Sequence, residues 1–171
     1  MIVDRNIKGM EVNTPEIFRD HRGEFVEIWN AMGEDFVEDC LSVSKKNVLR
    51  GFHGENCWKL VQCLHGDAWL VVVDCRKDSP THKNAWASSV NDENRLQVLV
   101  PPNCAIGHLC LSEKCLLHYK RSTYYAGADK QFTLKWDSVP GVIWPLWPSD
   151  CRIFPILSER DKGGLTLEEL P

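Results

Sequence analysis

The chain has 171 residues, and its 20 basic and 24 acidic side chains give a formal net charge of −4. This length is typical of one domain that buries a core without the help of disulfides or metals. The apolar stretches are too short to span a membrane, no basic run indicates nucleic-acid binding, and the N-terminus lacks the apolar segment of a signal peptide, so we expect a cytoplasmic protein.

Short segments near the two ends favour helix. At residues 14–20, Thr14 before Pro15 is typical of an N-cap followed by a first-turn proline, and the tail at residues 165–171 is the second candidate. Between them, apolar or alternating runs separated by Gly, Pro and Asn predict strands. In chain order these strands are expected at residues 23–29, 59–66, 68–76, 85–90, 95–102, 108–112, 115–125, 131–136 and 141–145.

Many short strands at this spacing predict an all-β sandwich or barrel, with no repeat and no boundary inside residues 1–171. The run WLVVVDC, residues 69–75, is almost continuously apolar, which predicts a strand buried on both faces. A small barrel of this kind has a mouth wide enough for one ligand. Polar residues that point into the barrel are therefore the candidates for chemistry.

Eight cysteines are scattered singly, without a Cys-x-x-Cys pair, and many lie inside apolar runs. We expect reduced, buried thiols that pack as small apolar side chains, and no zinc site. These cysteines are Cys40, Cys57, Cys63, Cys75, Cys104, Cys110, Cys115 and Cys151.

A few polar residues sit in apolar surroundings: His53, His108, Tyr119 and Asp161. Each alone is compatible with a structural role, since a buried imidazole or phenol needs only a hydrogen-bond partner. Spacing alone does not join them into one site.

Two joint hypotheses explain such a set. In the first, His53, Glu55 and His108 supply two imidazoles and a carboxylate to a metal such as non-heme iron, although no His-x-His motif is present. In the second, a His oriented by a carboxylate is a general base, a Tyr is the acid on the opposite side, and a Lys stabilises the negative charge that develops on an oxygen. The second set is what an epimerase needs when a carbonyl lies next to the carbon that is inverted.

Seven blocks occur in an order that resembles one family: FRDHRGEFVEIW, SVSKKNVLRGFH, KLVQCLHGDAWLVVVDCRKDSPT, VPPNCAIGHLCLS, YKRSTYY, KWDSVPGVIWP and ILSERD. From about Phe18 to Asp161 the chain resembles the dTDP-4-dehydrorhamnose 3,5-epimerases, cupin-fold enzymes of deoxysugar biosynthesis. The resemblance implies a jelly-roll barrel with a few short peripheral helices. It also implies an isomerase that uses no cofactor or metal and acts on a nucleotide-diphosphate sugar.

The resemblance also implies roles for individual residues. His53 would be the base, Asp161 the carboxylate that holds it, and Tyr119 the acid on the other face of the sugar. Lys59 and His108 would lie near the 4-keto oxygen. The binding residues would be Arg50 at a phosphate, Tyr125 at the sugar, Ser42 and Glu38 in the nucleotide or sugar region, and Arg22, Phe25 and Glu27 on an N-terminal strand that reaches the partner's site in a homodimer.

The chain departs from the family pattern around the substrate. Glu38 and Cys40 stand where a Gln and an Asn are usual, and Leu70 stands where an Asp is usual. The usual Ala-His-Gly-Phe is Gly-His-Leu-Cys at residues 107–110. The loop between His53 and the next strand is short and lacks the usual aromatic-Gln pair.

These departures imply retained chemistry on a different substrate. The short loop resembles the branch that epimerises GDP-4-keto-heptoses. The sequence leaves three questions open: which nucleotide the substrate carries, whether its sugar is a hexose or a heptose, and whether C3 alone or both C3 and C5 are inverted. A 3,4-ketoisomerase of the same fold, a metal-dependent cupin and a non-catalytic sugar-binding cupin also stay open.

Overall fold

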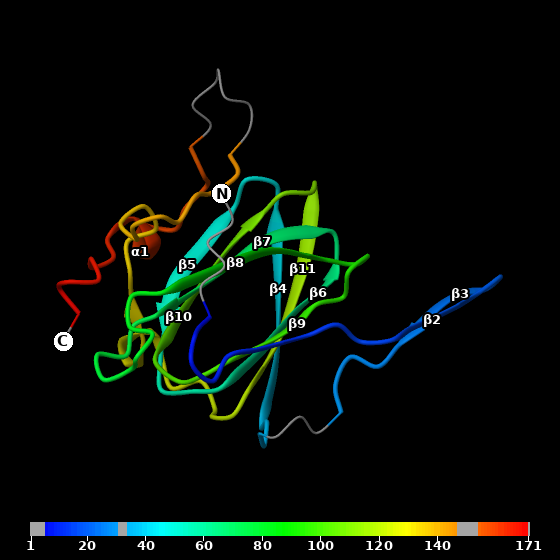
Figure 1. Cartoon of the computed structure of the whole chain (residues 1–171). Helices are drawn as coiled ribbons and strands as arrows, with labels where there is room; N and C mark the ends of the chain where they lie inside the picture. Colours follow the sequence, from blue (N-terminus) through cyan, green and yellow to red (C-terminus); the bar gives the residue numbers. More distant parts are fainter. Residues whose placement is uncertain (1–5, 31–33, 147–153, 171) are drawn as a thin grey trace.

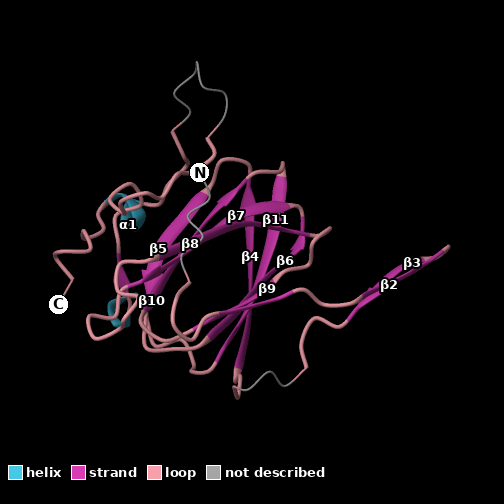
Figure 2. Ribbon diagram, viewed as in Figure 1, coloured by secondary structure: helices cyan, strands magenta, loops and turns pink. Residues whose placement is uncertain are grey.

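The computed structural model describes residues 6–30, 34–146 and 154–170. Two five-stranded antiparallel sheets face each other in these residues and form a jelly-roll barrel (Figure 1, Figure 2). The first sheet runs in the order β1 (Glu11–Asn13), β9 (Gln97–Val100), β6 (Lys59–His65), β11 (Lys114–Arg121) and β4 (Glu38–Lys45). The second runs β12 (Phe132–Thr133), β5 (Leu49–Gly54), β10 (Cys104–Cys110), β7 (Asp67–Asp74) and β8 (Ala85–Asn91).

The second sheet is buried on both faces, which confirms the expectation from the apolar run in β7. Leu70 and Val72 point into a cluster between the two sheets. Val71 and Val73 point the other way, into a cluster that the C-terminal half covers with residues such as Trp144. Because neighbouring strand residues face opposite sides, only a strand packed on both faces is apolar at every position. The all-β, cupin-type expectation is therefore confirmed.

Residues 14–20 are not helical, contrary to the prediction from Thr14 and Pro15. They contain β2 (Ile17–Asp20), which pairs with β3 (Gly23–Val26) as a hairpin. The backbone N–H of Arg22 donates to the Asp20 carboxylate at 2.8 Å and closes the turn. A tight turn with cross-strand pairing thus outweighs the local helix signal.

Two predictions in the C-terminal part were also wrong. Residues 165–170 form a turn in which the Thr166 hydroxyl and backbone N–H donate to the Glu169 carboxylate. Leu165 meanwhile bridges to Leu134. Residues 141–145 have no sheet partner among the described residues and instead bury Trp144, whose indole N–H donates to the Trp136 carbonyl at 2.9 Å.

The helical content of the described residues is small: a 3₁₀ turn at Ala128–Lys130 and α1 at Glu159–Lys162. No helix among them is long and apolar enough to cross a membrane. The seven cysteines in the described part of the chain are free, and all but Cys40 are buried, as expected; Cys151 lies outside the described residues.

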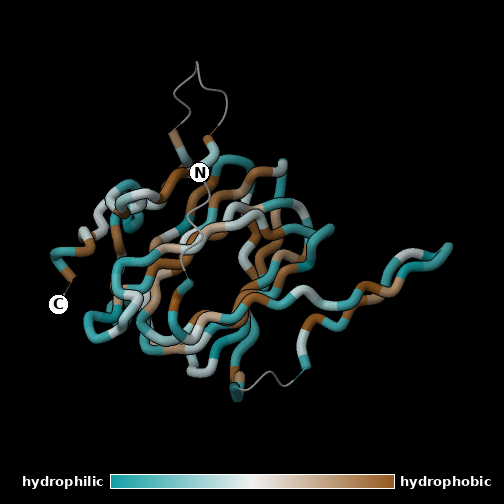
Figure 3. The backbone as a smooth tube through the Cα atoms, viewed as in Figure 1, coloured by the Kyte–Doolittle hydropathy of each residue, from teal (hydrophilic) through white to brown (hydrophobic). Residues whose placement is uncertain are grey.

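The β2–β3 hairpin projects from the barrel as an arm (Figure 1). Its rings Phe18 and Phe25 lie 6.3 Å apart, centroid to centroid, and are 55% and 68% exposed. Figure 3 shows hydrophobic positions along the arm behind a hydrophilic tip. The chain that follows the arm is fixed to the first sheet, since the side-chain amides of Gln97 and Gln62 donate to the carbonyls of Glu27 and Ile28.

Candidate active site

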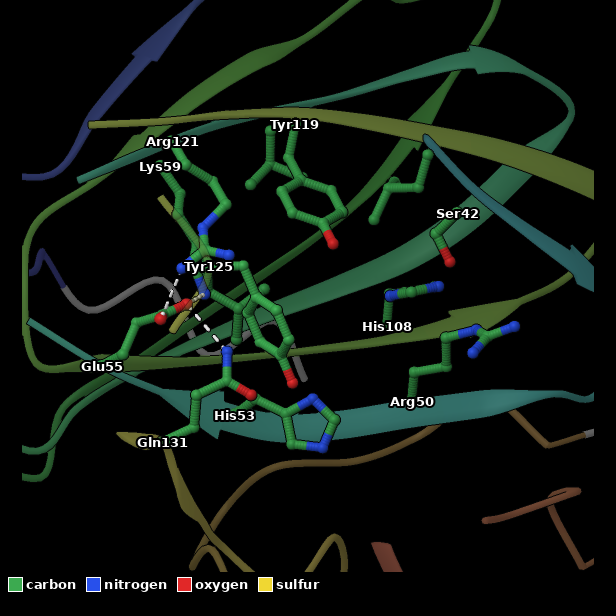
Figure 4. A pocket seen from close by; sticks show the side chains of 13 residues that line it. Ser42, Arg50, His53, Glu55, Lys59, His108, Tyr119, Arg121, Tyr125 and Gln131 are labelled. Atoms are coloured by element: carbon green, nitrogen blue, oxygen red, sulfur yellow. Dashed lines mark hydrogen bonds and ion pairs between the residues drawn. The ribbon is translucent and has the colours of Figure 1, made fainter. Parts of the chain in front are cut away.

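A cavity of about 210 Å³ opens between the two sheets (Figure 4). Strands β4, β6 and β11 form one wall, and β5 and β10 form the facing wall. The residues around it are mostly polar, although the strands that carry them are otherwise apolar. They are Ser42, Arg50, His53, Glu55, Lys59, Val61, Ile106, His108, Leu117, Tyr119, Arg121, Tyr125 and Gln131.

His53 and Asp161, which are 108 residues apart in the chain, meet at this cavity with 2.7 Å between Nε2 and Oδ1. Ser158 caps α1 by accepting from the Asp161 backbone N–H, and its own hydroxyl donates to Oδ2 at 2.8 Å. Burial alone raises the pKa of the Asp161 carboxyl, but the bonds from His53, Ser158 and the Gly51 backbone outweigh it and lower this pKa. The carboxylate is thus ionised and accepts a proton from Nε2, which in a neutral ring places the lone pair on Nδ1.

A bulge lets Arg50 and His53 share one face of β5, although residues three apart on a regular strand face opposite sides. The register shifts between the pairs Ile106–His53 and His108–Arg50. At Gly51, φ is +117°, and a Cβ atom would lie 2.6 Å from the backbone of Gly107. Only glycine fits this close approach, and the glycine thus brings the cation and the base to the same wall.

His108 lies on β10 opposite Arg50 and is buried, with 6% of its surface exposed. Its Nε2 has no hydrogen-bond partner among the described residues. Burial, followed by the nearby charges of Arg50 and His53, lowers the pKa of His108 to about 4. The ring is neutral at physiological pH, and a buried polar atom without a partner marks a place where a ligand can bind.

Tyr119 extends from β11 on the wall opposite His53 (Figure 4). Burial, followed by the neighbouring Cys40, raises the pKa of the Tyr119 phenol to about 12. Cys40 is its direct cross-strand partner on β4. The phenol therefore keeps its proton at neutral pH and is available as an acid across the cavity from the His53 ring.

Lys59 is ion-paired to Glu55, with 2.6 Å between Nζ and Oε1. The other carboxylate oxygen, Oε2, accepts from the Arg121 guanidinium at 2.7 Å, and the side-chain amide of Gln131 donates to Oε1 at 2.8 Å. Burial raises the pKa of the Glu55 carboxyl, but Lys59, Gln131 and Arg121 together hold it below its usual range.

The remaining predicted binding residues of the barrel occupy its mouth and one end. Arg50 is exposed and donates to the Ser44 hydroxyl at 3.0 Å. Ser42 lines the cavity nearby, and the Tyr125 ring stacks on Arg121 with 5.1 Å between the ring centroid and Cζ. Glu38 lies behind this end, where Oε2 accepts from the Tyr125 backbone N–H at 2.9 Å.

The structure does not bring Arg22, Phe25 and Glu27 to this cavity. Arg22 and Phe25 lie on the projecting arm, where Arg22 is ion-paired to Asp20 at 2.6 Å. Glu27 follows the arm. Leu70, at a position where the family usually has an Asp, packs in the core between the sheets.

The residues of the metal hypothesis do not form a cluster. Among the described residues, no group of three His, Cys, Asp or Glu side chains is arranged to hold a metal ion. The Glu55 carboxylate accepts from Lys59, Gln131 and Arg121 instead.

Arg121, Gln131 and Ser158 were not predicted from the sequence, although each contacts a residue that was. Arg121 had a usable signal, because it lies two residues after Tyr119 in an apolar strand and therefore faces the same side. Gln131 and Ser158 had none, because their roles depend on where the loop before β12 and the N-terminus of α1 meet β5.

The fold and the cavity together define a cupin-type jelly-roll enzyme with acid–base groups inside its barrel. The profile of the dTDP-4-dehydrorhamnose 3,5-epimerase family matches residues 4–169. The dTDP-4-dehydrorhamnose 3,5-epimerase of Salmonella typhimurium is 34% identical over 99% of this chain and 96% of its own length. The enzyme of Methanothermobacter thermautotrophicus is 32% identical, over 99% of this chain and 95% of its own.

Solved structures of epimerases also resemble this chain over most of its length. The Legionella pneumophila dTDP-6-deoxy-D-glucose-3,5-epimerase RmlC, in complex with dTDP-4-keto-L-rhamnose, has a TM-score of 0.88 and 29% identity, and the match covers 100% of this chain and 94% of that one. ChmJ, a 3'-monoepimerase from Streptomyces bikiniensis in complex with dTDP-quinovose, has a TM-score of 0.86 and 28% identity. The match covers 96% of this chain and 86% of ChmJ. The chain belongs to the dTDP-4-dehydrorhamnose 3,5-epimerase family and is an isomerase.

Proposed function

We propose that this chain epimerises a dTDP-linked 4-keto-deoxysugar at C3 and C5. The observation that carries the proposal is the His53–Asp161 pair at 2.7 Å on one wall of the cavity, with the protonated Tyr119 on the other. A base and an acid on opposite walls are what inversion of a carbon between them requires.

In this reaction the 4-keto group acidifies the neighbouring C–H bonds. Nδ1 of His53 takes the C3 proton, the C–H electron pair becomes the C3–C4 double bond, and the negative charge moves to the C4 oxygen. Tyr119 gives its phenolic proton to C3 from the opposite face, and the C4 carbonyl is restored. The phenolate regains a proton from water and His53 releases its proton to water, after which the same sequence runs at C5.

Lys59 and the neutral His108 ring would stabilise the charge on the C4 oxygen, since both project into the cavity. Arg50 at the mouth suits a diphosphate, because a guanidinium pairs with phosphate oxygens in a bidentate way. The named relatives act on dTDP sugars, which favours dTDP over the GDP-linked heptose alternative.

The test is incubation with dTDP- and GDP-linked 4-keto sugars in D₂O, followed by mass spectrometry and NMR. We expect two deuterons in the dTDP sugar and a loss of roughly 10² to 10⁴ in rate for His53→Asn. Tyr119→Phe should still exchange protons but invert little, because deprotonation remains. A single deuteron would restrict the reaction to one carbon, which NMR would assign to C3 or C5. Exchange with GDP sugars alone would show that the substrate carries GDP instead of dTDP. No exchange with any substrate would refute the proposal.

We also infer a homodimer in which the arm of each copy reaches the other's cavity. A two-stranded hairpin is marginal by itself in water, and exposed Phe18 and Phe25 rings need a partner surface. This arrangement would bring Arg22, Phe25 and Glu27 to the site of the other copy.

Light scattering after gel filtration tests the assembly, and a mixing experiment tests the shared site. Phe25→Ala and His53→Asn proteins, each weak alone, should regain part of the activity when their subunits are exchanged, because one mixed site has neither defect. A monomer, or mixtures no more active than the separate proteins, would contradict this arrangement.

A further inference from the structure

We propose that Glu55 is the positioning residue of Lys59: its carboxylate bridges Lys59 and Arg121 and so fixes the Lys59 ammonium at the cavity wall. The inference rests on the proposed function, because it assigns Glu55 a part in stabilising the enolate. Glu55 itself acts through Lys59.

The strand register creates the need for this bridge. Lys59 on β6 and Arg121 on β11 are direct cross-strand partners. Like charges in this position destabilise a sheet, and both residues are buried, with 9% and 2% of their surfaces exposed. Two cations placed side by side out of water need an anion between them.

Glu55, directly after the end of β5, is that anion. Its side chain is 9% exposed, and each of its oxygens serves a different cation: Oε1 lies 2.6 Å from Nζ of Lys59, and Oε2 lies 2.7 Å from Nη2 of Arg121. The amide of Gln131 donates to Oε1 as well. Figure 4 shows the carboxylate next to both cations, at the end of the cavity away from Arg50.

An amide cannot replace this carboxylate. Glutamine offers one acceptor oxygen and one NH₂ donor, so in either orientation it presents donor to donor at Lys59 or at Arg121. Aspartate keeps the charge but is one methylene shorter, and cannot reach both cations from the same backbone position. Both Glu55→Gln and Glu55→Asp should therefore break the bridge that fixes Lys59 beside Arg121.

The chemistry supplies a specific readout. The enolates formed at C3 and at C5 place their charge on the same C4 oxygen, so a poorly placed Lys59 slows both proton exchanges by the same factor. A sugar that merely shifted in the cavity would change the ratio of the two rates. Phosphate binding at Arg50, at the other end of the cavity, should be unaffected.

The experiment measures deuterium uptake at C3 and C5 with the full-length protein and a dTDP-4-keto sugar, and the affinity for dTDP. For Glu55→Gln we expect both uptake rates to fall about 10- to 100-fold, less than the 10² to 10³ that loss of an oxyanion donor itself costs. The ratio of the two rates and the dTDP affinity should stay unchanged. Glu113→Gln is the matched control, since Glu113 pairs with Lys46 on the surface.

A double-mutant cycle decides whether Glu55 acts through Lys59. In the Lys59→Met background, Glu55→Gln should change the rates by less than about twofold, because the group it positions is gone. Full additivity, an altered C3-to-C5 ratio or weakened dTDP binding would overturn the inference. Glu55→Asp is measured in the same way if the Gln variant does not fold. Wild-type protein without exchange would instead refute the proposed function.

Discussion

Asp161 and Asp74 are buried almost equally, yet they belong to regions with different tasks. Asp161 is 2% exposed and Asp74 is fully buried. Burial raises the pKa of Asp74, but hydrogen bonds from Arg76, Ser79 and Thr81 lower it to about 2, and the pKa of Asp161 is lowered in the same direction. Neither burial nor the direction of the pKa shift separates the two carboxylates.

Their partners separate them. The short hydrogen bonds to the Asp74 carboxylate come from the loop between β7 and β8: Arg76 donates twice at 2.8 Å, and the hydroxyls of Ser79 and Thr81 donate at 2.6 Å. Arg76 and Thr81 also bond to the Lys8 backbone, so this network ties the loop to the N-terminal segment. Asp161 holds His53, whose side chain is 27% exposed and lines the cavity. A buried carboxylate thus indicates a catalytic site when the side chain that it orients also faces a cavity where a substrate can bind.

The largest loss of activity is expected for Asp161→Asn. The amide can no longer hold the Nε2–H tautomer or stabilise the protonated ring, so the exchange rate should fall by roughly 10³ to 10⁴. Deuterium uptake and thermal unfolding, measured on the same preparation, check it. A rate close to that of the wild type, or a loss that merely follows unfolding, would contradict the catalytic role of Asp161.

Asp74→Asn should lower the stability of the protein and leave its exchange rate almost unchanged. Loss of the charge leaves the Arg76 guanidinium without its partner in a buried network, so the free energy of unfolding should fall by about 3 to 5 kcal/mol. The exchange rate per folded molecule, measured in the cold, should stay close to that of the wild type. Urea denaturation gives the stability. A folded but inactive variant would contradict the structural role assigned to this loop.

The lowered pKa of His108 leads us to expect that the free energy of unfolding depends on pH. The pKa of this residue is about 4 in the folded protein and 6.5 ordinarily, so the fold favours the neutral ring. The corresponding stabilisation is complete above pH 6.5 and is lost as the pH falls towards 4, a change of about 3 kcal/mol. Urea denaturation across this window should show a flatter profile for His108→Gln than for the wild type. Equal slopes would mean that other groups cause the loss.

The pH range in which Asp74 affects stability differs from that of His108. The stabilisation by Asp74 is present above its ordinary pKa of 3.8 and is lost only as the pH falls towards about 2. Loss of stability through protonation of His108 is therefore expected between pH 6.5 and 4, and loss below about pH 4 reports on carboxylates with lowered pKa values, Asp161 as well as Asp74.

Sequence patterns alone determined the all-β class, the doubly buried β7 and the family, because strand periodicity and motif order are written in the chain itself. They also singled out His53, Lys59, Tyr119 and Asp161 as candidates. Local signals failed at residues 14–20 and 165–170, where cross-strand pairing and core contacts outweigh helix propensity.

The family resemblance implies that Asp161 holds His53, but the geometry by which the polar groups meet comes from the packing of the folded chain. The bulge at Gly51 turns Arg50 and His53 to one wall, and α1 brings Asp161 to His53 across 108 residues of chain. The register of β6 and β11 sets Lys59 opposite Arg121, so that Glu55 lies between two cations. These contacts depend on strand register and on how distant segments pack, and neither is visible in local periodicity.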